Sequence, residues 1–302
     1  ADCGPAALAR KWRRPVTTRR GRTAFHARAG DAWTALFSKI GALEKASIAG
    51  VLLITLIAMG APWLTPYDLN LRVGEGYQPP SGAFWFGTDE IGRDLFSRIV
   101  VGIRYTWLPA LAVVLFSLVL GSAVGLVSGT AGGKTDMIIQ RSIELILILP
   151  ATLVALAVIA SLGSGLTNTM IAIAIVWWPW YARLCRDEVR RLIARPHVEA
   201  ARIAGARGPR FMLRYLLPGV MPSLIVAATL DIANVVLTVS LLSFLGLGQA
   251  APAPELGSMT ARSLDSLTVF WWLPILPGAV IFLLCFCANL AGDGLRAALP
   301  GR

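Results

Sequence analysis

Three polar side chains, Asp231, Asn234 and Thr238, interrupt an apolar stretch near residues 220–245. Their spacing of three and four residues places them on one face of a helix, as a polar stripe. Because an ionisable side chain is costly inside a membrane, the stripe should face protein or water rather than lipid. It can line a pathway for a polar substrate, or it can form a hydrogen-bonded seam between helices. The carboxylate of Glu144, near the end of another apolar stretch, is interpreted as structural.

A second stretch, S-G-T-A-G-G-K-T at residues 128–135, is similar to a phosphate-binding loop. The motif G-x-x-x-x-G-K-[ST] begins with glycine, whereas this chain has Ser128 at that position. Such a loop also follows a strand and opens a soluble helix, but here it joins two apolar stretches. We therefore expect that this chain does not bind ATP or its Mg²⁺.

Residue types suited to metal binding or catalysis are scarce. The cysteines and histidines of the chain are Cys3, Cys185, Cys285, Cys287, His26 and His197. They are too few and too scattered for a metal centre or a disulfide framework. The sequence also has no H-E-x-x-H motif, and no serine or carboxylate pair with supporting partners. We expect no catalytic residue, metal or cofactor, which argues against an intramembrane enzyme.

The elements that position the polar residues are long apolar segments. The chain has 302 residues, of which 56% are hydrophobic and 15% charged, whereas a soluble domain carries about 25% charged residues. Segments of about 19 to 26 residues can each cross a hydrocarbon core of roughly 30 Å. They lie near residues 46–64, 107–128, 137–161, 167–189, 220–245 and 271–291. The sequence thus predicts an all-α integral membrane protein with six transmembrane helices.

The distribution of basic residues predicts the orientation in the membrane. Residues 1–45 form a basic segment with ten Lys or Arg, followed by the membrane domain at 46–302. No secretory signal precedes the first apolar run, so we expect it to be retained as an anchor. With both termini cytoplasmic, the inner segments hold 23 Lys or Arg and the outer ones five. This split satisfies the positive-inside rule, and it favours a topology signal over a nucleic-acid-binding arm.

The segment between the fourth and fifth apolar stretches, residues 190–218, contains a predicted helix. Pro196 suits the first helical position and Gly205 suits the C-terminal stop. Glu199 lies in the first turn and Arg202 towards the last, an order that the helix dipole favours. The helix would have about nine residues and lie on the cytoplasmic side. A short rigid helix tied to two spans could transmit the movement of a partner protein to the membrane helices.

This segment resembles a loop of permeases in binding-protein-dependent ABC importers. The resemblance is carried by Glu199, Ala200, Ala201, Arg202, Gly205 and Leu217-Pro218. In that family the loop forms the coupling helix, which is seated in a groove of the ATP-hydrolysing subunit. The resemblance thus implies that these residues couple the chain to an ATPase, while ATP and Mg²⁺ are bound by the partner.

Further motifs are similar to the dipeptide, oligopeptide and nickel branch of these importers. They are FGTDEIGRDLFSR at 86–98, Gly102 and Arg104, the stretch 132–153, LSFLGLG at 242–248, and the stretch 271–296 ending in GDGLR. The resemblance covers residues 44–302 and is strongest to the second permease of dipeptide or oligopeptide importers. Two positions depart from the family pattern: Tyr215, where relatives often have histidine, and Val239, where they commonly have an acidic residue.

The resemblance implies a set of partners in a prokaryotic inner or plasma membrane. These are a homologous second permease, two ATP-binding subunits, an extracytoplasmic substrate-binding protein and membrane lipid, with no nucleic acid. Di- or oligopeptides are the expected substrates, with nickel chelates, glutathione and haem as alternatives. A carrier driven by an ion gradient, with Asp231 and Glu144 as coupling carboxylates, is the rival function. It would show repeat symmetry, which the sequence lacks, and it gives the cytoplasmic helix no role.

The outer segment 86–104 has charged residues at helical spacings with apolar residues between them. The pattern predicts an amphipathic helix at the outer membrane surface. Such a helix could dock a substrate-delivering protein or only cap the helix bundle, and both interpretations stay open.

Overall fold

The structure, a computed structural model, describes residues 41–249 and 252–298. Most of the expected basic segment 1–45 therefore lies outside the described residues. Within them the chain is mostly helical, and the extended pairing is limited to an isolated bridge between Thr88 and Asp94. The all-α fold class is confirmed.

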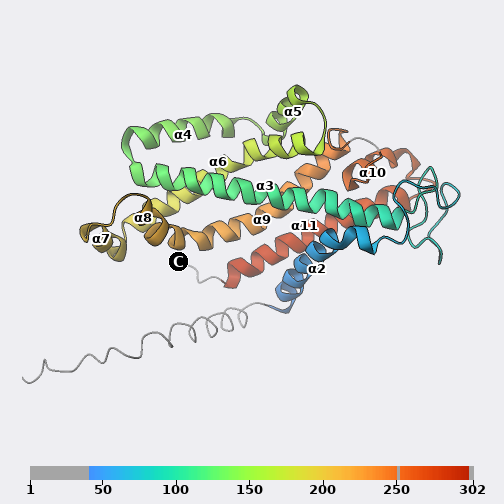
Figure 1. The fold of residues 1–302 in the computed structure, drawn as a ribbon, viewed down its shortest axis with the longest axis horizontal. Coiled ribbons are helices and arrows are strands. Elements are labelled where there is room, and N and C mark those ends of the chain that lie inside the picture. Colours follow the sequence, from blue (N-terminus) through green and yellow to red (C-terminus); the bar gives the residue numbers. More distant parts are fainter. Residues whose placement is uncertain (1–40, 250–251, 299–302) are drawn as a thin grey trace, which may run out of the picture.

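The helices lie roughly side by side in an elongated bundle (Figure 1). In chain order they are α2 (Ala42–Leu64), α3 (Leu95–Ala131), α4 (Gly133–Ile148), α5 (Ala151–Leu162), α6 (Leu166–Ile193), α7 (Pro196–Ile203), α8 (Gly208–Phe211), the π-helical turn η1 (Met212–Leu216), α9 (Leu217–Phe244), α10 (Leu256–Arg262), the 3-10 turn η2 (Leu264–Ser266) and α11 (Trp272–Ala298). The short elements α7 and α8 lie at one end of the bundle and α10 at the other.

Among the described residues, four helical stretches are long and apolar enough to cross a membrane: Lys45–Leu64, Leu95–Ala131, Gly208–Phe244 and Trp272–Ala298. The pair α4 and α5 passes the same test only when taken together. Helix α6 carries tryptophans, a tyrosine and several arginines, and it lies against α3, α5 and α9. Because protein rather than lipid surrounds much of α6, it tolerates polar groups that a lipid-facing helix would not. The count of six spans stays a prediction.

Helices α3 and α6 approach so closely that only glycine fits between them. A Cβ atom added at Gly121 or Gly125 would lie 2.5 Å from a backbone carbonyl oxygen of α6, that of Trp178 or Ala182 respectively. At Gly129 it would lie 2.7 Å from a side-chain carbon of Val189. This stripe, one glycine every four residues, lets the two backbones come into contact, as small residues do between membrane helices.

The main apolar core lies where α2, α3, α9 and α11 meet. Trp107 of α3 is fully buried there, and its indole Nε1 donates a hydrogen bond to the Thr55 hydroxyl of α2 at 3.0 Å. A tryptophan in a membrane core needs such a partner because its N–H has no water to bond.

The stretch 137–161, which the sequence predicts as one span, forms two helices bent by 88° at residues 149–150. Pro150 explains the break, because a proline disfavours helical geometry at the preceding residue. Leu149 accordingly adopts an extended conformation, with ψ of 143°. Few residues of this pair are buried: Asp136 and Ile143 on α4, and Ala155 and Ile159 on α5.

The expected surface helix over residues 86–104 is wrong in its first half. Residues 65–94 are non-helical, and Gly87 and Gly92 have φ of 77° and 89°, which a helix does not accommodate. Helix α3 begins only at Leu95, where the Asp94 carboxylate accepts the N–H of Ser97 at 2.8 Å. The rest of the segment is the start of a spanning helix.

Candidate functional site

Helix α7 is the short helix that the sequence predicts between Pro196 and Gly205. Pro196 occupies its first turn and Arg195, in extended conformation, precedes it. After the helix ends, Gly205 has φ of 90°, a conformation open to glycine but strained for other residues. The N–H of Gly205 donates to the carbonyl of Arg202, and that of Ala206 donates to the carbonyl of Ala201, both at 3.0 Å. The chain therefore reverses sharply after the helix, as the Pro and Gly positions indicate.

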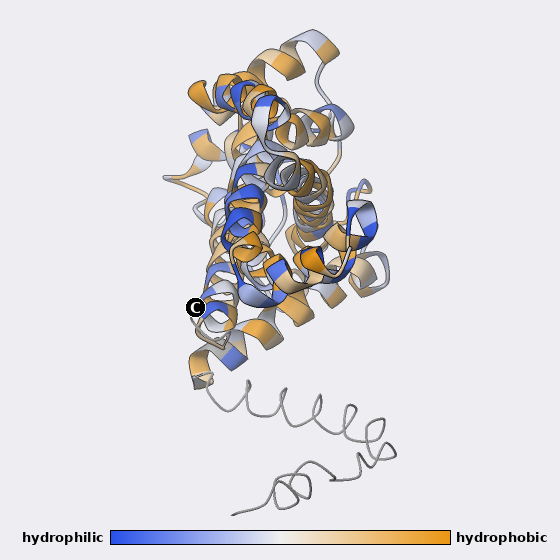
Figure 2. Cartoon of the chain, turned by 90° about the vertical axis from the view of Figure 1, so that its left-hand side faces the viewer, coloured by the Kyte–Doolittle hydropathy of each residue, from blue (hydrophilic) through white to orange (hydrophobic). Residues whose placement is uncertain are grey.

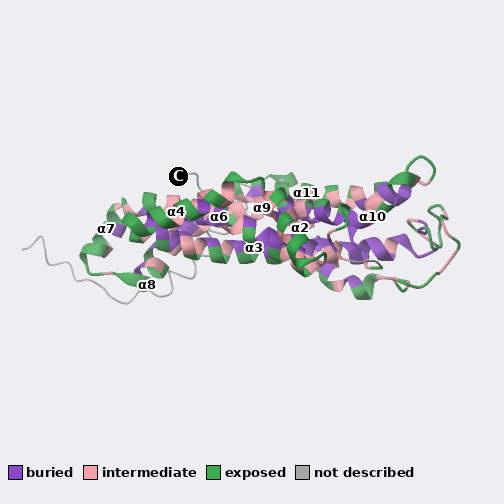
Figure 3. Ribbon diagram, turned by 90° about the horizontal axis from the view of Figure 1, so that it is seen from above, coloured by how far each residue is buried: buried purple, intermediate pink, exposed green. Residues whose placement is uncertain are grey.

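One face of α7 is free. Glu199, Ala200 and Arg202 are exposed and Ala201 is half-buried. Ile203 is 82% exposed, so this face carries one large apolar side chain beside its charged ones. Figure 2 looks onto this end of the bundle, where hydrophilic and hydrophobic segments alternate. In Figure 3, α7 and α8 are largely drawn as exposed.

The opposite face of α7 is anchored to two longer helices. Val198 is fully buried in an apolar cluster with Val189 and Leu192 of α6. Phe211 of α8 and Leu216, in the turn that leads into α9, belong to the same cluster. Helix α7 is thus packed against α6 and against η1, the turn that leads into α9.

A buried carboxylate lies near this end of the bundle. Asp136, in the first turn of α4, is 5% exposed and pairs with Arg186 and Arg190 of α6. Asp136 lies in the stretch 132–153 that is similar to the family, and its pairing with the two arginines was not predicted. A signal was present, since Arg186 and Arg190 are four residues apart and share one face of α6.

The polar stripe of α9 lies partly at the surface of this chain. Asn234 is exposed, while Asp231 and Thr238 are half-buried. The stripe bonds along its own helix: Thr238 Oγ1 donates to the carbonyl of Asn234 at 2.8 Å, and Asn234 Nδ2 lies 3.4 Å from Asp231 Oδ1. At its inner edge, the buried hydroxyl of Tyr181 on α6 faces Asp231. The structure thus brings the three residues together and leaves one edge of the stripe open.

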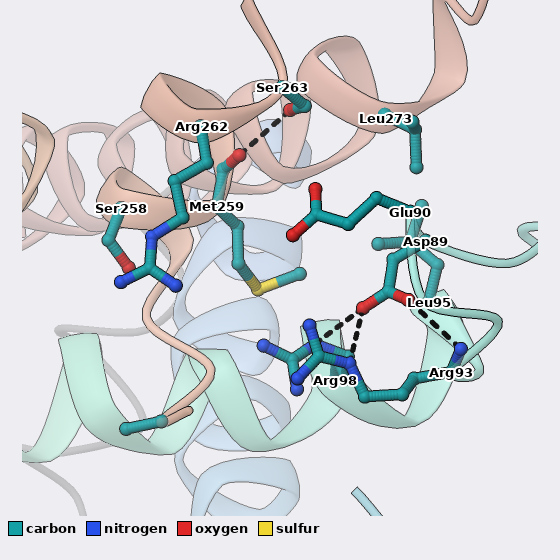
Figure 4. A pocket seen from close by; sticks show the side chains of 11 residues that line it. Asp89, Glu90, Arg93, Leu95, Arg98, Ser258, Met259, Arg262, Ser263 and Leu273 are labelled. Carbon is teal, nitrogen blue, oxygen red and sulfur yellow. Dashed lines mark hydrogen bonds and ion pairs between the residues drawn. The ribbon is translucent and has the colours of Figure 1, made fainter. Parts of the chain in front are cut away.

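The outer end of the bundle holds a second charged cluster (Figure 4). Asp89 pairs with Arg93 at 2.6 Å and with Arg98 at 3.6 Å. Arg98 is 3% exposed and also donates to the carbonyls of Leu69 and Pro252, at 3.0 and 3.3 Å. The small polar cavity drawn in Figure 4 lies between this cluster and α10. The arrangement fastens the non-helical outer segment to α3.

Within the described residues, no group of three or more His, Cys, Asp or Glu side chains is placed to hold a metal ion.

Comparisons with known proteins identify the family of the chain. The family described as binding-protein-dependent transport system inner membrane component matches residues 121–299. The di/tripeptide transport system permease protein DppC of Pseudomonas aeruginosa is 42% identical over 85% of this chain and 88% of its own length. The probable D,D-dipeptide permease DdpC of Escherichia coli is 40% identical over 85% and 87%. The nickel permease NikC of the same species is 37% identical over 82% and 89%.

Among solved structures, the methionine ABC transporter MetNI in an inward-facing conformation superposes with a TM-score of 0.55. It is 19% identical and covers 67% of this chain and 97% of its own, so it supports the fold alone. The chain therefore belongs to the family of binding-protein-dependent transport system inner membrane components, and it is a non-catalytic permease subunit of an ABC importer.

Proposed function

We propose that this permease imports di- or oligopeptides and forms half of a translocation pathway with a homologous second permease. The two most similar relatives reported above are named for dipeptides or tripeptides, at 42% and 40% identity. Relatives named for glutathione and nickel follow at 38% and 37%, so these substrates and haem are the alternatives. In this proposal the permease domain covers residues 46–302 and the coupling loop residues 190–218.

The exposed face of α7 is the observation that carries the coupling role. Two ATP-binding subunits lie on the cytoplasmic side, and one of them receives α7 in a groove. Ile203 supplies an apolar contact, Glu199 and Arg202 supply charges, and the small Ala200 lets the partner's backbone come near. Closure of the ATPases on ATP pushes α7, and packing through Val198 passes the movement to α6 and α9.

The stripe of Asp231, Asn234 and Thr238 lines the pathway in this proposal. The side chain of Asn234 is exposed. This exposure favours a pathway lining rather than a hydrogen-bonded seam between helices of this chain. A polar lining suits peptides, whose amide groups need hydrogen-bond partners during passage. The substrate arrives from an extracytoplasmic binding protein, and the membrane is a prokaryotic inner or plasma membrane with both termini cytoplasmic.

The test of the coupling role is affinity purification in mild detergent, with mass spectrometry of the co-eluting proteins. We expect a second permease and ATPase subunits, and we expect Glu199→Arg to lose the ATPase but keep the second permease. Glu75→Arg is the matched control, because it reverses the same charge at an exposed outer position. A homo-oligomer without an ATPase would contradict the proposal and favour a gradient-driven carrier.

The substrate is tested with the purified complex and its binding protein in proteoliposomes. Uptake of radiolabelled dialanine should depend on ATP, and unlabelled dipeptides should compete with it. Competition by glutathione, a nickel chelate or haem, with no competition by dipeptides, would overturn the peptide assignment.

A further inference from the structure

The carboxylate of Asp136 joins three helices at the end of the bundle that carries α7. Its two oxygens accept Nε and Nη2 of Arg186 at 2.6 and 2.7 Å, in a bidentate pair with α6. Arg190, one turn further along α6, also donates to it. From α3, the hydroxyl of Ser128 donates at 2.5 Å, and Gln140 of α4 donates to that hydroxyl at 3.1 Å. We call Asp136, Arg186 and Arg190 the inner cluster.

The inner cluster is the main attachment of the start of α4. Asp136 and Ile143 are the buried residues of this helix, and the preceding Gly132 and Gly133 have φ of 62° and 54°. Glycine has no Cβ atom, so these two residues do little to fix the direction of α4 relative to α3. A bidentate pair between arginine and a carboxylate, by contrast, fixes both distance and orientation. The start of α4 is therefore held to α6 by charge, while the buried Ile143 adds apolar packing further along the helix.

The same part of α6 holds α7. Val189, next to Arg190 in the chain, packs in the apolar cluster around Val198 of α7. Only residues 194 and 195 separate the end of α6 from α7. The last turns of α6 thus contact α7 through apolar side chains and α4 through charged ones.

We propose that Asp136 is a positioning residue for transport, which makes α4 follow α7 when the ATPase moves it. Through Arg186 and Arg190, a displacement of the end of α6 pulls the start of α4 with it. Helix α4 then carries the displacement to the bend at Pro150 and to α5. This inference rests on the proposed coupling function of α7.

The test measures whether α4 and α7 move together in the assembled complex with its ATPase. Nitroxide labels replace His197 on α7 and Leu145 on α4, both exposed, after replacement of the four native cysteines by alanine. Pulsed electron paramagnetic resonance compares the nucleotide-free complex with the complex trapped by ADP and vanadate. We expect the distance between positions 145 and 197 to stay constant in the otherwise unchanged chain.

In Asp136→Asn we expect this distance to shift on trapping by about 2 Å or more, the scale of helix movements at interfaces. Arg190 is the half-exposed partner of Asp136, so Arg190→Gln should give a smaller shift. This variant replaces Asp136→Asn in the test if the complex with Asp136→Asn does not assemble. Arg141→Gln is the control, because it removes a charge from the same helix where the side chain is 80% exposed and pairs with Glu144. This control should keep the distance constant.

A merely structural cluster would broaden the distances in both states equally, without a shift between them. That result, or a shift in the unchanged chain, would overturn the inference. A second label pair, at Leu43 and His197, reports whether α7 moves at all. If that pair shifts while Asp136→Asn has no effect, only this inference fails. If the pair does not shift, the proposed coupling function fails and this inference with it.

Discussion

Arg98 at the start of α3 donates a hydrogen bond to the carbonyl of Pro252, 154 residues further along the chain. The same guanidinium bonds the carbonyl of Leu69 and lies beside the carboxylate of Asp89. Three segments that are distant in sequence are thus held at the outer end of one helix. A glutamine in place of Arg98 would be polar, but its shorter side chain could not bond all of these groups in the same geometry.

Arg98→Gln should destabilise the permease by about 3 kcal/mol, because the carbonyls of Leu69 and Pro252 lose their charged donor. Asp89 keeps its pair with Arg93 but loses the second positive charge beside it. The measurement is thermal unfolding of the purified complex in detergent. Arg72→Gln is the control, since Arg72 is exposed and, among the described residues, its side chain donates to the nearby carbonyl of Gly74. Equal unfolding midpoints for the two variants would contradict the assigned role of Arg98.

Gly125→Ala should also destabilise the chain, by about 1–3 kcal/mol, because the added methyl group overlaps the backbone of α6. The new carbon would lie 2.5 Å from the Ala182 oxygen and 2.7 Å from Cys185 Cβ. Gly60→Ala in α2 is the matched control, because its nearest atom is a Leu64 methyl at 3.7 Å. Unfolding in detergent should show a loss for the first substitution and none for the second.

Ile203→Ala should weaken binding of the ATPase subunit about tenfold, as truncation of a central apolar contact does. Binding is measured by titrating the purified ATPase onto the permease pair in detergent. Leu213→Ala, at a residue that is 60% exposed but lies outside α7, should leave the affinity unchanged. If the ATPase subunit binds both variants with the same affinity, Ile203 at the end of α7 does not contact it.

The stability of the chain should fall as pH rises because of Glu255, which is 1% exposed. Burial raises the pKa of its carboxyl. The hydroxyl of Ser243, the N–H of Gln249 and the positive charge of Arg262 oppose this effect. The folded state therefore holds the proton more tightly than the unfolded chain. This stabilises the fold below the unfolded pKa of about 4.3, and the contribution is lost as pH rises through the folded pKa.

The glutamine in Glu255→Gln cannot ionise. The loss of stability with rising pH that Glu255 causes should therefore be absent in this variant. The check is the unfolding midpoint of both proteins in detergent across a pH series that begins near the unfolded pKa. Parallel pH profiles for the two proteins would show that Glu255 does not titrate as argued.

The sequence predicts those features that depend on local composition and spacing. Pro196 and Gly205 mark the ends of a helix because their backbone preferences are intrinsic, and the apolar segments follow from the cost of polar groups in lipid. The burial of Arg98 could not be predicted, because its acceptors are main-chain carbonyls whose position depends on the tertiary fold. The pairing of Asp136 with Arg186 joins residues 50 apart, and charge alone does not select this partner among many arginines.

Pro150 lies inside the stretch 137–161, which the sequence predicts as one span, and its presence alone does not fix the angle between α4 and α5. Likewise, the charged residues of 86–104 follow a helical period, yet two glycines with positive φ stop the helix before Leu95. In both places a backbone constraint prevails over the side-chain pattern.

The bend at Pro150 has a consequence for the assembled transporter. Proline has no N–H, so the carbonyl of Ile146 lacks the donor that a continuous helix would supply. The residues that lead into the bend, from Leu145 to Leu149, are all apolar. Ile148 and Leu149 beside it are 72% and 57% exposed on this chain. Lipid tails offer no donor to an open carbonyl, so we expect another protein surface or a water-filled space to meet this side of the bend in the working complex.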